Sequence, residues 1–418
     1  MHAAQEWQSS RSDDSWTALK AAGVLLAALS IIFDGFDNQA LGLAIASIAR
    51  EWSVTPSSFA PVSFIGLAGM TIGTAIAGVL GDRFGRRAMM IASVGLFGLF
   101  TLSTTLVHSM EMLTLVRFLT GLGLGGAMPN ATALAAEFSP ARARPLTVTA
   151  TIVCVPLGGL LGGMVAAAIL PAHGWRAMFL VAGAAPIALA AALALWLPES
   201  PRYLAEKAAP QPAGAGEKSN VAQLFTAGLG RDTVSVWAAF FLCLIAVYTT
   251  FSWLPATLSG AGFDQKTASL GLASFNFGGV AGALLAAVVI TRIGSRLTMT
   301  ALAIAGVIIA GLVLMVGASQ LSHTLLLVAL AALGFTVNGV QTTLFALASH
   351  IYPARIRATG VGAALGFGRV GAMASSLAGA YVLASGNTVG FFTILGLAMA
   401  GTTIALLAVS RHIPANAA

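Results

Sequence analysis

Twelve long apolar segments constrain the fold of this chain more than any other feature of its sequence. Each segment has at least about 20 residues, the length that an α-helix needs to cross roughly 30 Å of hydrocarbon. We place these segments at residues 19–49, 59–80, 88–107, 111–137, 145–170, 176–197, 233–258, 267–290, 297–317, 324–350, 358–384 and 387–409. Charged residues make up only 8% of the chain and hydrophobic residues 57%, whereas soluble domains carry about 25% charged residues. The sequence therefore predicts an all-α polytopic membrane protein.

The basic residues predict the orientation of these segments. If the N-terminus is cytoplasmic, 16 of the 21 Lys and Arg residues fall on the cytoplasmic side, and only Arg50, Arg176 and Lys266 fall on the other. This asymmetry matches the positive-inside rule, so we expect both termini in the cytoplasm. It also accounts for the net charge of +7 without a nucleic-acid partner.

Two short loop sequences recur, which indicates that the chain is a duplication of six segments. Residues 82–87 correspond to 291–296, and residues 139–144 correspond to 352–357, at nearly the same offset. Parallel repeats of this kind place a substrate site between the halves at the membrane midplane. An Ala/Pro/Gly-rich stretch at 208–216 predicts a flexible linker between the halves. We divide the chain into an N-terminal tail 1–18, a first bundle 19–198, a linker 199–231, a second bundle 232–410 and a C-terminal tail 411–418.

Asp34 and Asp37 are two acids inside a segment that otherwise carries no charge from Lys20 to Arg50. At 1.5 Å per residue, Asp34 lies ~21 Å from Lys20 and ~24 Å from Arg50, close to the bilayer midplane. Such acids usually face a polar cavity and carry protons, ions or substrate. The three-residue spacing puts both on one helical face. We expect one of them to be the proton-coupling site, the alternative being a structural ion pair.

Two arginines also fall inside apolar segments. Arg117 lies ~9 Å from a helix end, where a long side chain could also extend to the interface. Arg369 lies ~18 Å beyond Arg357 and is too deep for that. Because a guanidinium binds a carboxylate with two hydrogen bonds, we expect Arg369 to bind the carboxylate of a substrate or of Asp34 or Asp37.

Several uncharged side chains lie at similar depths and could contact a ligand. The polar candidates are Asn130, Asn276, Asn338 and Gln341. Each could equally form a hydrogen bond between helices. Phe36 and Tyr248 could stack on an aromatic ring, although aromatic residues in such segments more often pack against neighbours or lipid.

The chain resembles the major facilitator superfamily over essentially its whole length. The resemblance rests on Gly78–Arg87, Arg117–Gly121 and Pro198–Arg202. It implies two pseudosymmetric six-helix bundles with twelve transmembrane helices in total. It also implies that one loop latches the halves together in the outward-open state. The residues of this gating loop are Gly81, Asp82, Arg83, Gly85, Arg86 and Arg87.

A narrower resemblance is to the aromatic acid:proton symporters, of the 4-hydroxybenzoate and protocatechuate transporter type. It rests on Asp34–Asp37, Arg117–Asn130, Val337–Gln341, Arg357–Gly362 and Gly368–Arg369. The chain departs from the pattern in a short central loop and in Thr291, which stands where the first half has Asp82. The resemblance implies proton-coupled import of benzoate-type acids by alternating access, with Arg117 beside the acids at 34 and 37.

Two other functions remain open at this stage. A partial resemblance of residues 155–159 to an antiporter motif keeps proton-driven efflux of drugs or aromatic compounds possible. A non-transporting receptor for aromatic acids is the other alternative. We expect no enzymatic activity, cofactor or metal, because the sequence shows no phosphate loop, metal-ligand cluster or nucleophile motif. We expect a monomer in the bacterial inner membrane, with aromatic acids, protons and lipid as its partners.

Overall fold

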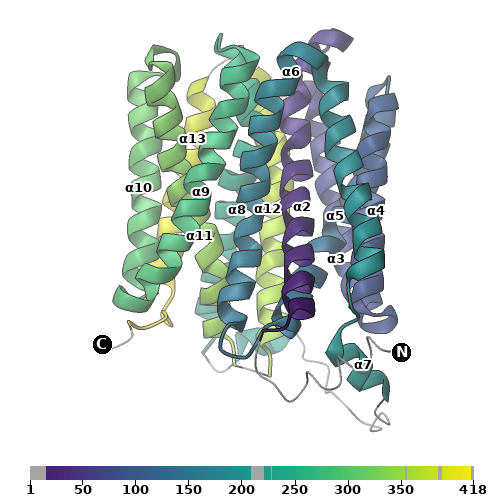
Figure 1. The fold of residues 1–418 in the computed structure, drawn as a ribbon. Coiled ribbons are helices and arrows are strands. Elements are labelled where there is room, and N and C mark those ends of the chain that lie inside the picture. Colours follow the sequence, from purple (N-terminus) through teal and green to yellow (C-terminus); the bar gives the residue numbers. More distant parts are fainter. Residues whose placement is uncertain (1–15, 209–220, 227, 354, 385–387, 416–418) are drawn as a thin grey trace.

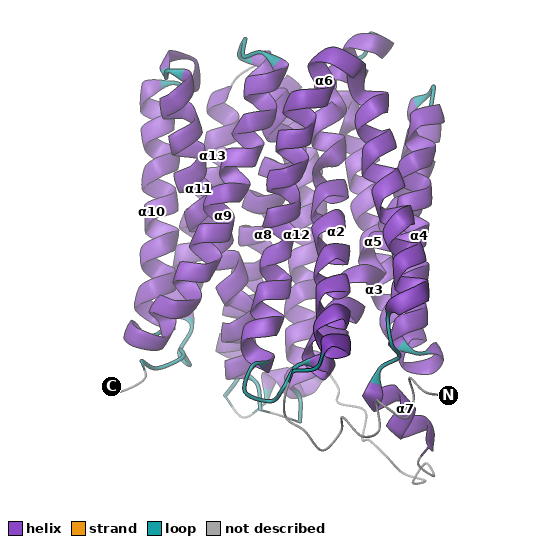
Figure 2. Cartoon of the chain, viewed as in Figure 1, coloured by secondary structure: helices purple, strands orange, loops and turns teal. Residues whose placement is uncertain are grey.

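Long helices running side by side form almost the whole molecule (Figures 1 and 2). The computed structural model describes residues 16–208, 221–226, 228–353, 355–384 and 388–415. The N-terminal half contains α2 (Ala18–Trp52), α3 (Ala60–Phe84), α4 (Arg86–Ser103), α5 (Met110–Phe138) and α6 (Arg144–Trp196). The C-terminal half contains α8 (Gly230–Gly260), α9 (Gln265–Ile293), α10 (Ser295–Val316), α11 (His323–Ile351), α12 (Arg357–Ala384) and α13 (Thr388–Ala408). Short 3₁₀ helices, among them η2 (Pro56–Phe59), η3 (Thr104–Leu106) and η4 (Val221–Phe225), connect some of them.

Eleven helices within the described ranges are long and apolar enough to cross a membrane. The longest of them, α6, has 53 residues and consists of two helices merged across a kink at Gly174, whose φ is 73°. The kink separates the two segments predicted at 145–170 and 176–197, so the eleven helices contain twelve helical spans. The predicted all-α membrane fold is therefore confirmed.

Large apolar side chains cover the outside of the bundle as well as its interior. Val79, Leu195, Met315 and Tyr381 are at least 70% exposed in the isolated chain. In water this apolar surface would be unfavourable, whereas in a bilayer it contacts lipid. The exposed apolar surface and the helix lengths agree in placing the long helices across a membrane.

Corresponding helices of the two halves pack in the same way. α3 packs on α5 in the first half, and α9 packs on α11 in the second. Both crossings are so close that a side chain would not fit: a Cβ at Gly121 would lie 2.2 Å from the carbonyl oxygen of Gly66, and one at Gly278 would lie 1.8 Å from that of Ala331. Small residues allow this close approach between membrane helices.

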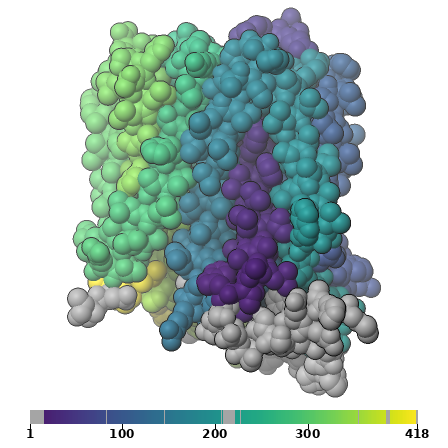
Figure 3. Space-filling view, in the orientation of Figure 1, coloured from purple at the N-terminus to yellow at the C-terminus, as the bar shows by residue number. Residues whose placement is uncertain are grey.

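The helices that line the boundary between the halves come from both. α2 packs on both α6 and α8, and α6 packs on α9. In the space-filling view, α2 is visible between the two segments of α6 (Figure 3). α3 and α12 also contact each other across the boundary. These helices carry most of the side chains considered below.

The two ends of the bundle differ. One end carries the start of α2, the end of α13 and the short helix α7 (Pro201–Ala208), and we call it the α7 end (Figure 1). The charge distribution predicts that this end is cytoplasmic. The predicted linker 199–231 contains α7 and η4. Residues 209–216 of its proposed flexible stretch lie outside the described residues.

The chain after α13 folds back onto the loop between α9 and α10. The backbone N–H of Ser295 donates to the carbonyl of Ile413 at 2.9 Å, and the N–H of Ile413 donates to Ser295 Oγ at 2.8 Å. His412 contacts Ser295 Oγ through Nδ1 at 3.1 Å and the Leu406 carbonyl oxygen through Nε2 at 3.1 Å. This segment therefore forms part of the α7 end of the second half.

Candidate functional site

Asp37 and Arg117 form a buried ion pair within the N-terminal half. Arg117 Nη1 lies 3.6 Å from Asp37 Oδ2, and Arg117 and Asp37 are 5% and 2% exposed. Thr101 donates a hydrogen bond to the other carboxylate oxygen at 2.5 Å. Arg117 also donates to Thr104 Oγ1 at 2.8 Å and lies over the Phe179 ring, 5.2 Å from its centroid. Four helical elements besides α2 therefore contribute to the environment of one carboxylate.

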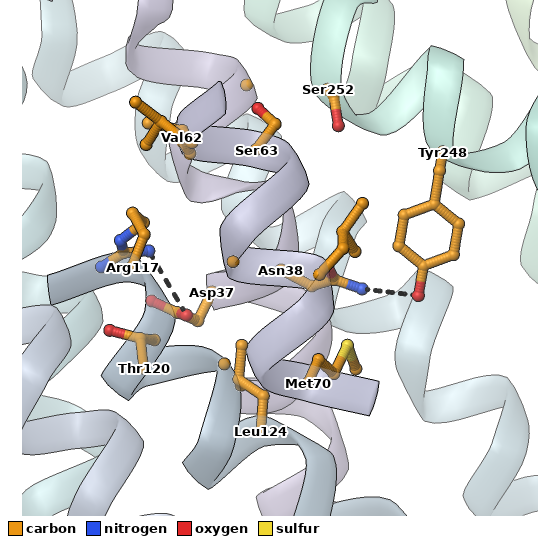
Figure 4. A pocket seen from close by; sticks show the side chains of 15 residues that line it. Asp37, Asn38, Val62, Ser63, Met70, Arg117, Thr120, Leu124, Tyr248 and Ser252 are labelled. Atoms are coloured by element: carbon orange, nitrogen blue, oxygen red, sulfur yellow. Dashed lines mark hydrogen bonds and ion pairs between the residues drawn. The ribbon is translucent and has the colours of Figure 1, made fainter. Parts of the chain in front are cut away.

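A small cavity lies against this pair (Figure 4). Its lining residues on α2 follow Asp37 toward the end of that helix, which places the cavity on the side away from the α7 end. It encloses about 50 Å³ between α2, α3, α5 and α8. In Figure 4 the side chains of Asp37 and Arg117 point toward each other on one side of this cavity, and Asn38 and Tyr248 meet on the other. Since a water needs about 10–15 Å³ of such space, the cavity has room for a few water molecules.

Asp34 lines a second cavity, together with Arg369. This cavity encloses about 40 Å³, and Gln341 of α11 and Tyr248 of α8 also line it. Asp34 Oδ1 and Arg369 Nε are buried, and neither has a hydrogen-bond partner among the described residues. Buried polar atoms are almost always hydrogen-bonded. The two unpartnered atoms therefore mark a place where a small polar ligand would improve the hydrogen bonding.

Four side chains lie where the two cavities meet. Three of them line both cavities, and the fourth, Arg369, is bonded to two of these three. Arg369 Nη1 donates to Tyr248 Oη at 2.8 Å and contacts Met70 Sδ at 3.1 Å. Asn38 Nδ2 donates to the same Tyr248 oxygen at 3.4 Å. Asn38, Met70 and Tyr248 line both cavities. We call these four residues the midplane wall, because they separate the cavity of Asp37 from that of Asp34.

Asn276 lies outside both cavities. Its amide pairs with that of Gln39, with hydrogen bonds of 2.7 Å and 3.2 Å, and both residues are 0% exposed. A Cβ added at Gly159 would lie 2.0 Å from Gln39 Nε2, so α6 closes over this pair. The amide of Asn276 is thus used between α9 and α2, that is, between the two halves of the chain.

Three further candidates also lie away from both cavities. Asn130 donates to the carbonyl of Gly126 at 2.8 Å, and Asn338 donates to that of Gly334 at 3.3 Å, each within its own helix. The Phe36 ring fills the space beside Gly162 of α6, where a Cβ would approach it to 2.6 Å. These side chains therefore contact helices, and the structure does not bring them to the cavities.

The predicted gating loop lies at the α7 end, where α3 ends and α4 begins. Gly85 forms the turn with φ of 96°. Arg86 pairs with Glu137 of α5, which also accepts a hydrogen bond from Ser200. Arg87 donates to the backbone carbonyls of Leu197 at 2.6 Å and Ala194 at 2.5 Å. The loop is thereby tied to the end of α6.

The other members of the loop make fewer contacts. The guanidinium of Arg83 lies 5.3 Å from the Phe84 ring centroid. The backbone carbonyl of Arg83 accepts a hydrogen bond from Tyr203 of α7 at 3.4 Å. A Cβ at Gly81 would lie 2.8 Å from Asn130 Oδ1, so α3 and α5 are close there. The side chain of Asp82 lies outside the described part of the structure.

Sequence reasoning missed Asn38, Met70 and Gln39. Asn38 and Gln39 follow Asp37 directly, so their polarity in an apolar segment was an available signal. Met70 gave no signal, because a methionine in an apolar helix is usually a packing residue. For metals, the described residues contain no group of three or more His, Cys, Asp or Glu that could hold an ion.

Comparison with curated proteins shows relatives over most of the chain. The chain is 35% identical over 410 residues to the gallate transporter of Pseudomonas putida, a match that covers 92% of this chain and 90% of the relative. It is 35% identical over 408 residues to the 4-hydroxybenzoate transporter PcaK of Acinetobacter baylyi, covering 91% and 88% of the two chains. The predicted resemblance to aromatic-acid transporters is thereby confirmed.

Comparison with solved structures confirms the predicted fold. The crystal structure of a D-xylose-proton symporter matches with a TM-score of 0.76 over 94% of this chain and 98% of that one, at 19% sequence identity. The family model of the Major Facilitator Superfamily matches residues 27–376. This chain belongs to the major facilitator superfamily.

Proposed function

We propose that this protein is a secondary transporter that imports small aromatic carboxylates together with protons. The relatives named as gallate and 4-hydroxybenzoate transporters support the substrate class. The observation that carries the proposal is the arrangement of Asp34 and Arg369, which line one buried cavity with unpartnered polar atoms. The cavity is bordered by helices from both halves, as expected for a transport site.

Arg369 binds the substrate carboxylate in this proposal. Arg369 is 8% exposed, and its Nε is unpartnered within the described chain. The Tyr248 hydroxyl, now hydrogen-bonded to Arg369, can also bind a carboxylate oxygen or a ring hydroxyl. A buried guanidinium with free donors is well suited to a planar carboxylate.

The charge of Asp34 makes substrate binding depend on protonation. Arg369 can neutralise only one of two carboxylates, and an uncompensated charge in a low-dielectric cavity costs several kcal/mol, on the order of 2.5–3.5 on insertion scales. An ionised Asp34 therefore opposes the binding of an anionic substrate. When Asp34 is protonated, the substrate takes its place beside Arg369 without a second unpaired charge.

Asp37 provides a second place for proton binding. A proton on its carboxylate removes the attraction to Arg117, which keeps its hydrogen bond to Thr104 and its contact with Phe179. The pair lies on the cavity farther from the α7 end, so in the predicted orientation it faces the outer side. We propose that protons reach Asp37 first, and that rocking of the two halves then exposes the substrate to the cytoplasm.

Transport into proteoliposomes tests this function directly. Purified protein would be given labelled 4-hydroxybenzoate with an inward proton gradient, with unlabelled gallate and benzoate as competitors. We expect accumulation that an uncoupler abolishes. Vesicles that accumulate the acid only under the reversed gradient would indicate efflux, and saturable binding without accumulation would indicate a receptor. Either result would contradict the proposal.

A further inference from the structure

A third cavity lies at the end of the molecule opposite to α7, and the proposed transport cycle does not use it. It encloses about 420 Å³ between α2 and η2 of the first half and α8, α12 and α13 of the second. The two midplane cavities enclose about 50 and 40 Å³. We call the large one the outer vestibule. Its volume is in the range of small-molecule sites, about 300–1,000 Å³.

The outer vestibule combines apolar walls with a few polar groups. Val54, Pro56 and Val382 are among its apolar lining residues, and the polar residues Arg50, Thr257 and Ser259 also line it. Thr257 Oγ1 and Ser259 Oγ are buried and have no hydrogen-bond partner among the residues that the structure describes. Thr257 is only 5% exposed. Leaving a buried hydroxyl unpaired is unfavourable, so a ligand that accepts or donates hydrogen bonds there is favoured.

Arg50 is the charged residue that lines the vestibule. Glu51, the acidic residue next to it in sequence, is hydrogen-bonded to other side chains. Glu51 accepts hydrogen bonds from Arg176 at 2.6 Å and from Trp175 Nε1 at 2.7 Å. Within the described ranges, Arg50 itself makes no ion pair. A guanidinium without a carboxylate partner attracts an anion.

We propose that the outer vestibule is a separate binding site for small aromatic carboxylates, used before the midplane site. Arg50 binds the carboxylate, the apolar walls contact the ring, and the hydroxyls of Thr257 and Ser259 bind ring substituents or a carboxylate oxygen. The choice of an aromatic acid rests on the proposed function. The site itself rests on the cavity, the unpaired guanidinium and the two unpaired hydroxyls.

The position of the vestibule along α2 supports its place before the midplane. Arg50 is 13 residues from Asp37, which corresponds to roughly 20 Å along a helix. Between them, α2 and α8 are in close contact at Gly42, where a Cβ would lie 2.2 Å from the Phe251 carbonyl oxygen. At this contact, on the edge of the cavity of Asp37, the backbones of α2 and α8 leave no room for a side chain. A ligand held at Arg50 therefore lies on the outer side of this contact between α2 and α8.

Thiol labelling at Gly260 tests the site without requiring transport. Gly260 lines the vestibule, and a Cβ there would have no atom within 4 Å. Gly260→Cys should react with a charged, membrane-impermeant methanethiosulfonate. The wild type is the control and should react little, because its Cys243 is buried and its Cys154 is partly buried. We expect 4-hydroxybenzoate to slow the labelling at least several-fold and acetate to leave it unchanged.

Arg50→Gln in the Gly260→Cys background identifies the anchor. We expect this substitution to abolish protection by 4-hydroxybenzoate. Lys266→Gln, which removes an exposed basic residue at the same end outside the vestibule, should leave protection intact. Thr257→Val should weaken protection about tenfold, as expected for a change of about 1.4 kcal/mol. Absence of protection in Gly260→Cys, or protection that survives Arg50→Gln, would overturn the proposal.

The same protein preparations separate this proposal from the proposed function. If 4-hydroxybenzoate protects the introduced thiol of Gly260→Cys but no aromatic acid is transported, the vestibule site stands and the proposed import fails. If import occurs with no protection, the transport function stands and the vestibule site is refuted. In an Asp34→Asn background, where coupled transport should be lost, we expect protection to persist.

Discussion

The side chain of Arg369 donates a hydrogen bond to the hydroxyl of Tyr248 at 2.8 Å, at the boundary between the two midplane cavities. Tyr248→Phe would remove this acceptor, which also accepts from Asn38 at 3.4 Å. The substitution also removes the hydroxyl that is proposed to bind the substrate carboxylate. Since a hydrogen bond to a charged group contributes about 1.5–3 kcal/mol, we expect the apparent affinity for substrate to fall roughly tenfold or more. Concentration-dependent uptake would measure the change. Tyr381→Phe, on the same α12 as Arg369 but 81% exposed, is the matched control and should behave as wild type.

Substitution of Asp37 should uncouple transport from protons. Asp37→Asn leaves Arg117 without its ionic partner, and removing one member of a buried pair typically costs about 3–5 kcal/mol. We expect gradient-driven accumulation to disappear while exchange of labelled for unlabelled substrate continues. Thr101→Val, which removes only the hydrogen bond at 2.5 Å, should reduce accumulation without abolishing it. Accumulation by Asp37→Asn at the wild-type level would rule out this role.

Asp34 should give substrate binding its pH dependence. An ionised Asp34 repels the substrate carboxylate, so binding to the wild type should weaken as the pH rises. Asp34→Asn is permanently neutral at this position, and its affinity should stay nearly constant over the same pH range. Equilibrium binding to detergent-solubilised protein at several pH values measures both. An unchanged pH slope in Asp34→Asn would show that another group is responsible.

The amide pair between Gln39 and Asn276 should stabilise the contact between the halves. Gln39→Leu leaves the buried amide of Asn276 without this partner, and an unsatisfied buried group costs about 1–3 kcal/mol. Replacing both amides by leucine removes the mismatch, so the double variant should be less destabilised than the sum of the single variants. The double-mutant cycle compares the free energies of unfolding, measured in detergent, of the wild type, the two single variants and the double variant. Additive effects would mean that the two amides do not interact energetically.

His412 should make the docking of the C-terminal segment pH-dependent. Partial burial, as the largest cause, lowers the pKa of His412 below its usual 6.5. The hydrogen bond to the Leu406 carbonyl and the charge of Asp232 act in the opposite direction, and Arg296 and His350 act in the same direction as burial. The neutral ring is therefore favoured in the docked state. Docking is fully stabilised above the unfolded pKa and weakens as the pH falls below it. Hydrogen exchange at Ile413, corrected for intrinsic rates, should accelerate at a pH of about 5.5 relative to about 7.5, on either side of the ordinary histidine pKa.

A His412→Gln variant provides the comparison for that experiment. It cannot titrate in this range, so its corrected exchange at Ile413 should be the same at both pH values. If the variant and the wild type show equal acceleration, the pH effect comes from a group other than His412.

The sequence alone was sufficient for the helices but for only part of the site. Long apolar runs predicted the spans, because the cost of exposed backbone in lipid leaves helices as the main solution. Asp34, Asp37 and Arg369 were recognisable because a charge at such depth needs a reason. The proximity of Arg117 to Asp37, separated by 80 positions, was implied only by the family resemblance.

The remaining contacts could not be derived from a single sequence. Asn276 pairs with Gln39, 237 positions away, and an amide has no sequence pattern that distinguishes a ligand contact from a helix contact. The outer vestibule was also not predicted, since it forms where segments from α2, η2, α8, α12 and α13 fail to fill the space between them. Cavities depend on the relative positions of whole helices, which periodicity does not encode.

The location of the Asp37–Arg117 pair has a consequence for the kinetics of the proposed transport cycle. The hydrogen bonds that cross between the halves near the midplane include those of Gln39 with Asn276, Asn38 with Tyr248 and Met70 with Arg369. Hydrogen bonds between membrane helices contribute only about 0.6 kcal/mol on average, so breaking them once per cycle adds little to the activation barrier. Asp37 and Arg117 both belong to the N-terminal half, on α2 and α5. In the proposed cycle, rocking of one half against the other would therefore leave this ionic contact intact, and a proton rather than the motion itself would determine when it opens.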